Sequence, residues 1–304
     1  MVCDQRTDSF IIAVDARNGK ELWKKSRTNF EAYSTPAIYK PKDGPAQVIV
    51  LGSHTVDAYS LDKGERLWWV GKVGSYPKGV PLLGTDMVYV IADGGDEPFL
   101  PPFDETLKAD TNKQSDSNKD QRIHRDEMKS HKEASEHFGW LDANNDGYID
   151  RAEYDFVRNS TTLGHGLTAV RLKGQGDLTS SNVAWSVKKS YPSIPAPLIY
   201  RGVMYLMKEG GIVSSLDPAS GPVLKQGRTP DALEEYYASP VAADGKIFVV
   251  SASGKVTVLK ADAQWEVLAM NDLDEEVWAT PAIAGNNLYI RTRSALYSFG
   301  GNAK

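Results

Sequence analysis

A short motif recurs along this chain and restricts it to folds built from repeated units. Residues 13–23 align with residues 58–68 at an offset of 45, and both copies carry glycine, leucine and tryptophan at matching places. Residues 215–225 give a third copy, with Lys225 where the tryptophan stood. Self-similarity at a fixed interval is the signature of a repeat architecture, because each unit buries its apolar faces only against its neighbours.

A second marker, a small residue followed by proline, travels with the motif. It falls at Pro36, Pro81, Pro197, Pro240 and Pro281, so successive prolines are 45, 116, 43 and 41 residues apart. The long interval holds one repeat plus about 70 further residues. A separate insertion therefore interrupts the repeats there.

Each repeat carries short apolar strands bounded by turn residues. One strand of each unit is predicted at 47–51, 87–91, 203–207, 246–250 and 288–291, and the next strand at, for example, 256–260 or 295–299. A period of about 40–47 residues with four strands per unit is typical of a β-propeller blade. We therefore predict an all-β chain of four-stranded blades with five to six repeats. A β-sandwich with accidental internal similarity is the alternative.

The pattern Asp-x-x-x-Gly-x-x-Leu-Trp followed by small-x-Pro resembles the repeat of the pyrroloquinoline-quinone-like propeller family. That family includes quinoprotein alcohol dehydrogenases and the propeller lipoprotein of outer-membrane assembly. In this pattern Gly19 and Gly64 fit the turn, and Trp23 and Trp68 are expected to lock between blades. The resemblance implies the fold and a periplasmic or extracellular location, but it does not imply the quinone cofactor.

The repeats predict three regions: blades in 1–95, an insertion in 96–165, and blades in 166–304. Residues 87–92 and 168–172 fit strands two and three of one blade, so the insertion should rise from the face that carries the connections between blades. Pro98, Pro101, Pro102 and residues 159–164 are its expected hinges. The first repeat opens at strand two and the last stops after strand three. We expect from this that one or more N-terminal blades of a longer parent are missing, and with them any signal peptide.

Inside the insertion, residues 142–153 carry the spacing of a calcium-binding loop. Oxygen-bearing side chains stand at positions 1, 3, 5, 9 and 12, and Gly147 stands at position 6, where the backbone must turn sharply. Position 7 needs to offer only its carbonyl oxygen, and a glutamate at position 12 can chelate with both oxygens. The loop resembles an EF-hand, and its predicted Ca²⁺ ligands are Asp142, Asn144, Asp146, Tyr148, Asp150 and Glu153.

A weaker loop precedes it at residues 116–127, with Asp116, Asn118, Asp120, Arg122 and Glu127 as predicted ligands. Gln121 replaces the glycine, and His124 at position 9 is a poor calcium ligand. Asp110 and Asn112 offer an alternative register for positions 1 and 3. We expect this loop to bind calcium weakly or to serve only for packing.

Two further features fit a paired arrangement. Ile123 and Ile149 both occupy position 8, where paired loops form a short β-bridge, and residues 128–141 between the loops favour a helix. Residues 154–157 suggest a short exiting helix. His124, His131 and His137 lack the spacing of a zinc helix, so we interpret them as solvated.

Composition excludes several classes of protein. A net charge of −5 without a basic stripe argues against nucleic-acid binding, and no apolar run approaches the about 18 residues of a membrane span. The single cysteine, Cys3, excludes internal disulfides and is expected to be a strand residue. No Ser-His-Asp order, nucleophile elbow or phosphate loop is present in the sequence.

We therefore expect a non-enzymatic scaffold that binds a protein or small ligand on one propeller face, with Ca²⁺ held by the insertion. The alternative is a pyrroloquinoline-quinone-dependent dehydrogenase, which fold resemblance alone supports. Calcium is expected to staple the inserted loop. A sensor would need an exposed apolar groove, for which Phe138, Trp140, Leu141, Phe156 and Val157 are the candidates.

Overall fold

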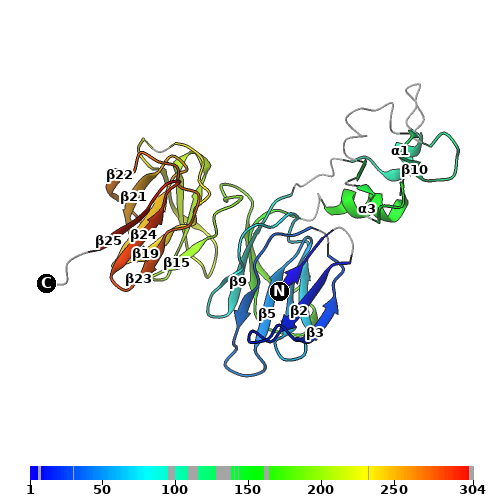
Figure 1. Ribbon diagram of the computed structural model, residues 1–304, viewed down its shortest axis with the longest axis horizontal. Coiled ribbons are helices and arrows are strands. Elements are labelled where there is room, and N and C mark those ends of the chain that lie inside the picture. Colours follow the sequence, from blue (N-terminus) through cyan, green and yellow to red (C-terminus); the bar gives the residue numbers. More distant parts are fainter. Residues whose placement is uncertain are drawn as a thin grey trace.

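The computed structural model describes residues 1–5, 8–29, 31–94, 100–108, 116–127, 138–139, 141–142, 144–160, 164–231 and 233–300. Six antiparallel sheets follow one another along the chain, and we number them blade 1 to blade 6. In Figure 1 the helices stand apart from the sheets, which run from blue blade 1 to red blade 6.

Within the blades the strands pair in up-and-down order. Blade 1 contains β1 (Val2–Cys3), β2 (Phe10–Val14) and β3 (Glu21–Ser26); blade 2 contains β4 (Ala37–Tyr39), β5 (Gln47–Leu51), β6 (Thr55–Ser60) and β7 (Arg66–Gly71); blade 3 contains β8 (Leu82–Leu83), β9 (Met87–Ala92), β12 (Gly166–Arg171) and β14 (Val183–Val187). Blade 4 contains β15 (Leu198–Tyr200), β16 (Val203–Lys208), β17 (Ile212–Leu216) and β18 (Val223–Arg228); blade 5 contains β19 (Val241–Ala243), β20 (Lys246–Val250), β21 (Lys255–Lys260) and β22 (Val267–Asp272); blade 6 contains β23 (Ala282–Ala284), β24 (Asn287–Arg291) and β25 (Leu296–Gly300).

The predicted all-β fold of four-stranded blades is confirmed. Blades 2 to 5 each hold four antiparallel strands paired in up-and-down order. The observed bounds of β5 and β20 are the predicted ones. Blade 1 contains the strands predicted as two, three and four of its repeat, and blade 6 contains strands one, two and three. Blade 2 also gains a short parallel strand, β13 (Gly176–Asp177), from the turn between β12 and β14.

Alternating side chains bury both faces of the inner blades. In β5, Val48 and Val50 pack toward blade 1, whereas Ile49 and Leu51 pack toward blade 3. The same alternation produces one apolar cluster for each neighbouring pair of blades, five in all among the described residues. The cores of this protein therefore lie between blades.

The glycine and the tryptophan of the repeat motif meet across these boundaries. Trp23 on blade 1 lies over Gly64 in the β6–β7 turn of blade 2, and its indole N–H donates to Leu61 O at 3.1 Å. Trp185 on blade 3 lies over Gly221 and donates to Pro218 O at 3.2 Å. Both tryptophans thus lie between blades, as predicted: Trp23 lies over the Gly64 turn, and Trp68 is buried in the cluster between blades 2 and 3.

The small-x-proline marker forms a second set of links between blades. The Ser34 hydroxyl donates to Gly79 O at 2.8 Å, and the Ser239 hydroxyl accepts from Ala196 N at 2.9 Å. Ser239 N in turn donates to the Thr280 hydroxyl at 3.0 Å. These three bonds join the segments that precede the prolines of neighbouring repeats.

The insertion leaves blade 3 between β9 and β12, as the strand assignment predicted. Asp93, at the end of β9, forms a bridge with Ser75 in the connection between blades 2 and 3. Lys78 Nζ from that connection bonds Asp93 Oδ2 at 2.6 Å and Ser193 Oγ at 3.0 Å. The insertion therefore rises from the face that carries the connections between blades, which we call the connection face.

Three glycines close the base of the insertion. A Cβ on Gly94 would lie 2.4 Å from Gly164 O, and one on Gly74 would lie 2.7 Å from Asp93 O. All three glycines have positive φ angles, 106° at Gly74, 150° at Gly94 and 87° at Gly164. We call Gly74, Gly94 and Gly164 the glycine neck. Of the expected hinge residues, Pro98 and residues 161–163 lie outside the described residues.

We predict that Gly64→Ala destabilises the fold more than Gly19→Ala does. Both glycines have a positive φ, but a Cβ at Gly64 would meet the Trp23 ring at 2.4 Å, whereas one at Gly19 meets nothing within 4 Å. The backbone penalty alone is about 1 kcal/mol, and overpacking adds about 1–3 kcal/mol at Gly64. Urea denaturation of the two variants measures the difference, and equal destabilisation would contradict the interlock.

Candidate metal centre

The two predicted metal-binding loops lie side by side. β10 (Ile123–His124) and β11 (Tyr148–Ile149) pair antiparallel, with Ile123 opposite Ile149 and His124 opposite Tyr148. This is the bridge expected from position 8 of each loop. Both isoleucines are buried, at 2% and 0% exposure, so the bridge also anchors the core of the insertion.

In the second loop, backbone N–H groups fix the predicted ligand side chains. Asp142 accepts from Asp146 N at 3.1 Å and from Gly147 N at 3.1 Å, and Asn144 Oδ1 accepts from Asp146 N at 2.8 Å. Asp146 Oδ1 accepts from Tyr148 N at 3.0 Å. Gly147 has a φ of 90°, as the sharp turn at position 6 requires.

Glu153 closes the second loop from the helix that follows it. It lies on α3 (Arg151–Ser160), and its carboxylate accepts from Asn144 N at 3.2 Å and from Asp150 N at 3.1 Å. Asp150 Oδ1 accepts in return from Glu153 N at 2.9 Å, as an N-terminal cap does. The carboxylate at position 12 is thus held across the loop from position 3.

The first loop repeats most of this hydrogen-bond pattern. Asp116 accepts from Asp120 N at 3.1 Å and from Gln121 N at 3.0 Å, and Glu127 accepts from Asn118 N and from His124 N. Gln121 takes a φ of 64° in place of the glycine. The loop therefore folds as its partner does, at the backbone cost of a side chain in the left-handed region.

His124 distinguishes the two loops chemically. Its Nε2 lies 2.6 Å from Asp120 Oδ2 and 3.2 Å from Asn118 Nδ2. The bond to His124 is the main reason that the pKa of Asp120 is lowered. The imidazole thus engages the side chains at positions 3 and 5, which in the second loop have no such competitor at position 9.

The pKa values of the two glutamates at position 12 also shift in opposite directions. Burial raises the pKa of Glu153, and the nearby carboxylates of Asp150 and Asp142 raise it further, so the net shift is upward. For Glu127 burial also raises the pKa, but bonds from His124 N and Ser117 outweigh it and the net shift is downward. The second loop concentrates uncompensated negative charge, which a divalent cation would relieve.

The donor set of the second loop suits calcium. Carboxylate, amide and carbonyl oxygens are the ligands that Ca²⁺ takes, and all predicted ligands of this loop offer them. Across the described ranges, no three His, Cys, Asp or Glu side chains converge closely enough to hold a metal by themselves. The carboxylates instead accept bonds from the loop's own N–H groups.

Most of the proposed sensor residues form a closed core. Phe138, Leu141 and Val157 are buried together with Phe103 of α1 (Phe103–Lys108), at 0–6% exposure. Tyr154 also joins this core, and its hydroxyl bonds Thr106 Oγ1 at 2.6 Å. Trp140, residues 128–137, and the alternative ligands Asp110 and Asn112 lie outside the described residues.

Phe156, the remaining described candidate, is half-buried; it packs against this core and also contacts the propeller. Its ring packs edge to face against His54 in the β5–β6 turn of blade 2, with centroids 4.9 Å apart and planes at 87°. Burial lowers the pKa of His54 to about 4, and neither ring nitrogen has a hydrogen-bond partner among the described residues. Sequence reasoning missed His54; a histidine in a turn gives no signal that an insertion about a hundred residues later packs on it.

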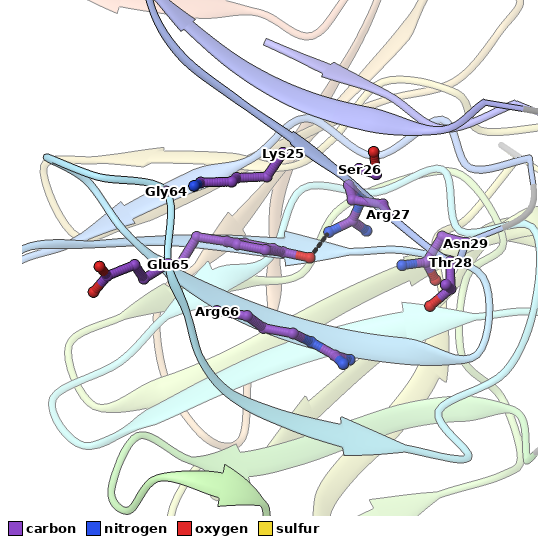
Figure 2. Close-up of a pocket in the computed structure, with 9 residues that line it drawn as sticks. Lys25, Ser26, Arg27, Thr28, Asn29, Gly64, Glu65 and Arg66 are labelled. Atoms are coloured by element: carbon purple, nitrogen blue, oxygen red, sulfur yellow. Dashed lines mark hydrogen bonds between the residues drawn. The ribbon is translucent and has the colours of Figure 1, made fainter.

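A charged network and a cavity lie between blades 1 and 2. Arg27 pairs with Asp4 at 2.7 Å, lies 3.5 Å from Asp57 and donates to the Tyr59 hydroxyl at 2.8 Å, and these ionised side chains are at most 1% exposed. Burial raises the pKa of Tyr59 to about 12, so its phenol stays protonated at neutral pH. Figure 2 shows Lys25, Arg27 and Arg66 around this cavity of about 430 Å³.

The charged side chains of this network have a structural role. Arg27 is neutralised by Asp4 and Asp57, and Arg66 is also bound to Asp57. Sequence reasoning missed this network too, although an aspartate in the middle of the apolar strand β6 was a possible signal.

One comparison with known protein families supports the assigned repeat. Residues 161–301 match the family model described as outer membrane protein assembly factor BamB. Among solved structures, BamB from Moraxella catarrhalis is 16% identical with a TM-score of 0.42, over 98% of this chain and 80% of that one. The computationally designed Ika8 protein is 10% identical with a TM-score of 0.44, over 93% and 74%. No curated protein matches, and no described helix is both long and apolar enough to cross a membrane.

We predict that Arg27→Met is strongly destabilising. It leaves Asp4 and Asp57 buried without their cation, a loss of about 3–5 kcal/mol for a broken buried pair. Arg17→Met is the matched control, because the Arg17–Asp15 pair is solvated and its loss should not change stability measurably. Guanidinium denaturation compares the two, and an Arg27→Met protein as stable as the wild type would contradict the structural role.

We also predict a pH dependence that originates at His54. Its pKa is about 4 when folded and 6.5 otherwise, so between these values the unfolded chain takes up a proton that the folded chain does not. The contribution of His54 to the free energy of unfolding is therefore fully present above pH 6.5 and declines as the pH falls toward 4. At pH 5 the loss from this group is about 2 kcal/mol. Denaturation at pH 7 and pH 5 should show a smaller decline in His54→Gly than in the wild type, and equal declines would refute the prediction.

Proposed function

We propose that this protein is a non-enzymatic β-propeller scaffold whose inserted loop pair binds calcium, with the second loop as the principal site. The observation that carries the proposal is that the side chains of Asp142, Asn144, Asp146 and Glu153 each accept a hydrogen bond from an N–H group of the same loop. Calcium would take these side chains, the Tyr148 carbonyl and Asp150 as ligands and would neutralise their crowded charge.

The first loop has a secondary role in this proposal. Asp116, Asn118, Asp120, Arg122 and Glu127 present the same frame, but His124 engages Asp120 and Asn118. Calcium must displace that contact before it reaches position 5. The loop therefore binds calcium more weakly and supports its partner through the β10–β11 bridge.

Calcium has a stapling role here. Phe138, Leu141 and Val157 are packed within the insertion, so they offer no ready apolar groove of the kind that a sensor exposes. Holding Glu153 to Asp142 and Asn144 instead ties α3 to the start of its loop. The result is a fixed insertion on the connection face, where a protein partner or small ligand would bind.

The proposed location is outside the cytoplasm. The match of residues 161–301 to the model described as an outer membrane protein assembly factor supports a bacterial envelope setting. Extracellular calcium-binding modules operate with dissociation constants of about 10⁻⁴–10⁻³ M, so even a modest site is filled where calcium is abundant.

Calorimetric titration of the chelator-stripped protein tests the calcium site. We predict that Glu153→Gln weakens the tighter site by at least about tenfold, because it removes one of two chelating oxygens, a change of about 1.4 kcal/mol. Glu127→Gln, the same substitution at the same loop position, should leave the tighter site unchanged.

Two results would refute the proposal. One is the absence of binding by the wild type at millimolar calcium. The other is an equal loss in both variants, which would remove the distinction between the loops.

A further inference from the structure

The contact between His54 and Phe156 joins the insertion to the propeller beside the glycine neck. Phe156 belongs to α3 and His54 to the β5–β6 turn of blade 2, a different blade from the one that carries the insertion. Covalently the insertion is attached only to blade 3. The ring contact therefore gives it a second point of attachment.

The turn that carries His54 is tightly determined. His54 N donates to Gly74 O at 2.7 Å, and Gly74 is part of the glycine neck. The backbone of His54 has a φ of 82°, a conformation that costs a non-glycine residue energy and that glycine adopts freely. The imidazole therefore stands at a position whose backbone conformation favours glycine.

Helix α3 connects this contact to the second loop. Glu153 and Phe156 are three residues apart and so lie within one turn of the same helix. In the structure the Glu153 carboxylate is closed onto Asn144 while the Phe156 ring is seated on His54. One position of α3 therefore satisfies both contacts.

We propose that His54 is a positioning residue for the calcium site: it holds α3, through Phe156, in the orientation in which Glu153 closes the second loop. The inference rests on the proposed calcium function. By reciprocity, whatever favours the seated helix strengthens calcium binding, and calcium in turn secures the β5–β6 turn of blade 2. Calcium bound in the insertion thereby orders a neighbouring blade.

The test is calcium titration of His54→Gly, Phe156→Ala and the double variant. Glycine suits the φ of 82°, so His54→Gly removes the ring without straining the turn. We predict that each single variant binds calcium about three- to tenfold more weakly, the equivalent of one aromatic pair. The double variant should be no weaker than the weaker single variant, because both substitutions remove the same contact.

Tyr191→Ala is the matched control. Tyr191 forms a ring contact with His165, at 6.1 Å between centroids, and this pair does not include α3. Its loss should leave calcium affinity unchanged. A loss equal to that of His54→Gly would show that any weakened ring pair lowers the affinity and would overturn the positioning role.

Hydrogen exchange provides a second readout. Calcium should increase amide protection at residues 51–56 in the wild type and not in Phe156→Ala. If the wild type binds calcium but His54→Gly binds it equally well, the positioning role fails and the calcium site stands. If the wild type binds no calcium, the proposed function and this inference fail together.

Discussion

The contact of an aromatic ring with a glycine turn of the next blade is the interaction on which the rest of this structure depends. An isolated blade of three or four short strands has two apolar faces and no core of its own. Trp23 over Gly64 and Trp185 over Gly221 fix neighbouring sheets in register, and the apolar clusters between blades form around that register. The connection face is assembled by the same repeat, through hydroxyl bonds such as that of Ser34 to Gly79.

This frame explains how an insertion of largely different character can be held in place. At the glycine neck, the chain entering the insertion and the chain leaving it approach so closely that a Cβ on Gly94 would clash with Gly164 O. Ser75 and Lys78 bind the base of the insertion at Asp93. Beyond the neck, the insertion has its own core around Phe138 and Ile149. The blades and the insertion differ in how negative charge is compensated. Between blades, Arg27 neutralises buried aspartates, whereas in the second loop neighbouring carboxylates raise the pKa of Glu153.

The sequence predicted the fold well where the physical rule is local. Alternating apolar residues defined β5 and β20, and the spacing of Gly64 and Trp23 anticipated an interlock between blades. The β-bridge between Ile123 and Ile149 followed from loop position alone. Calcium ligation by the two loops remains a prediction, since loop spacing and geometry describe a frame and not its affinity.

What the sequence did not reveal depends on contacts between distant segments. His54 meets Phe156, and Arg27 meets Asp4 and Asp57, across separations that no periodic pattern records. The competition of His124 for Asp120 also required side-chain geometry, although the residue type at position 9 had already suggested a weak site.

A crystal structure determined in millimolar calcium tests the central claim most directly. The account predicts a Ca²⁺ ion in the second loop at about 2.3–2.6 Å from oxygens of Asp142, Asn144, Asp146, Tyr148 and Glu153, with Phe156 still seated on His54. A second loop without an ion under those conditions, or an ion bound only elsewhere on the propeller, would contradict it.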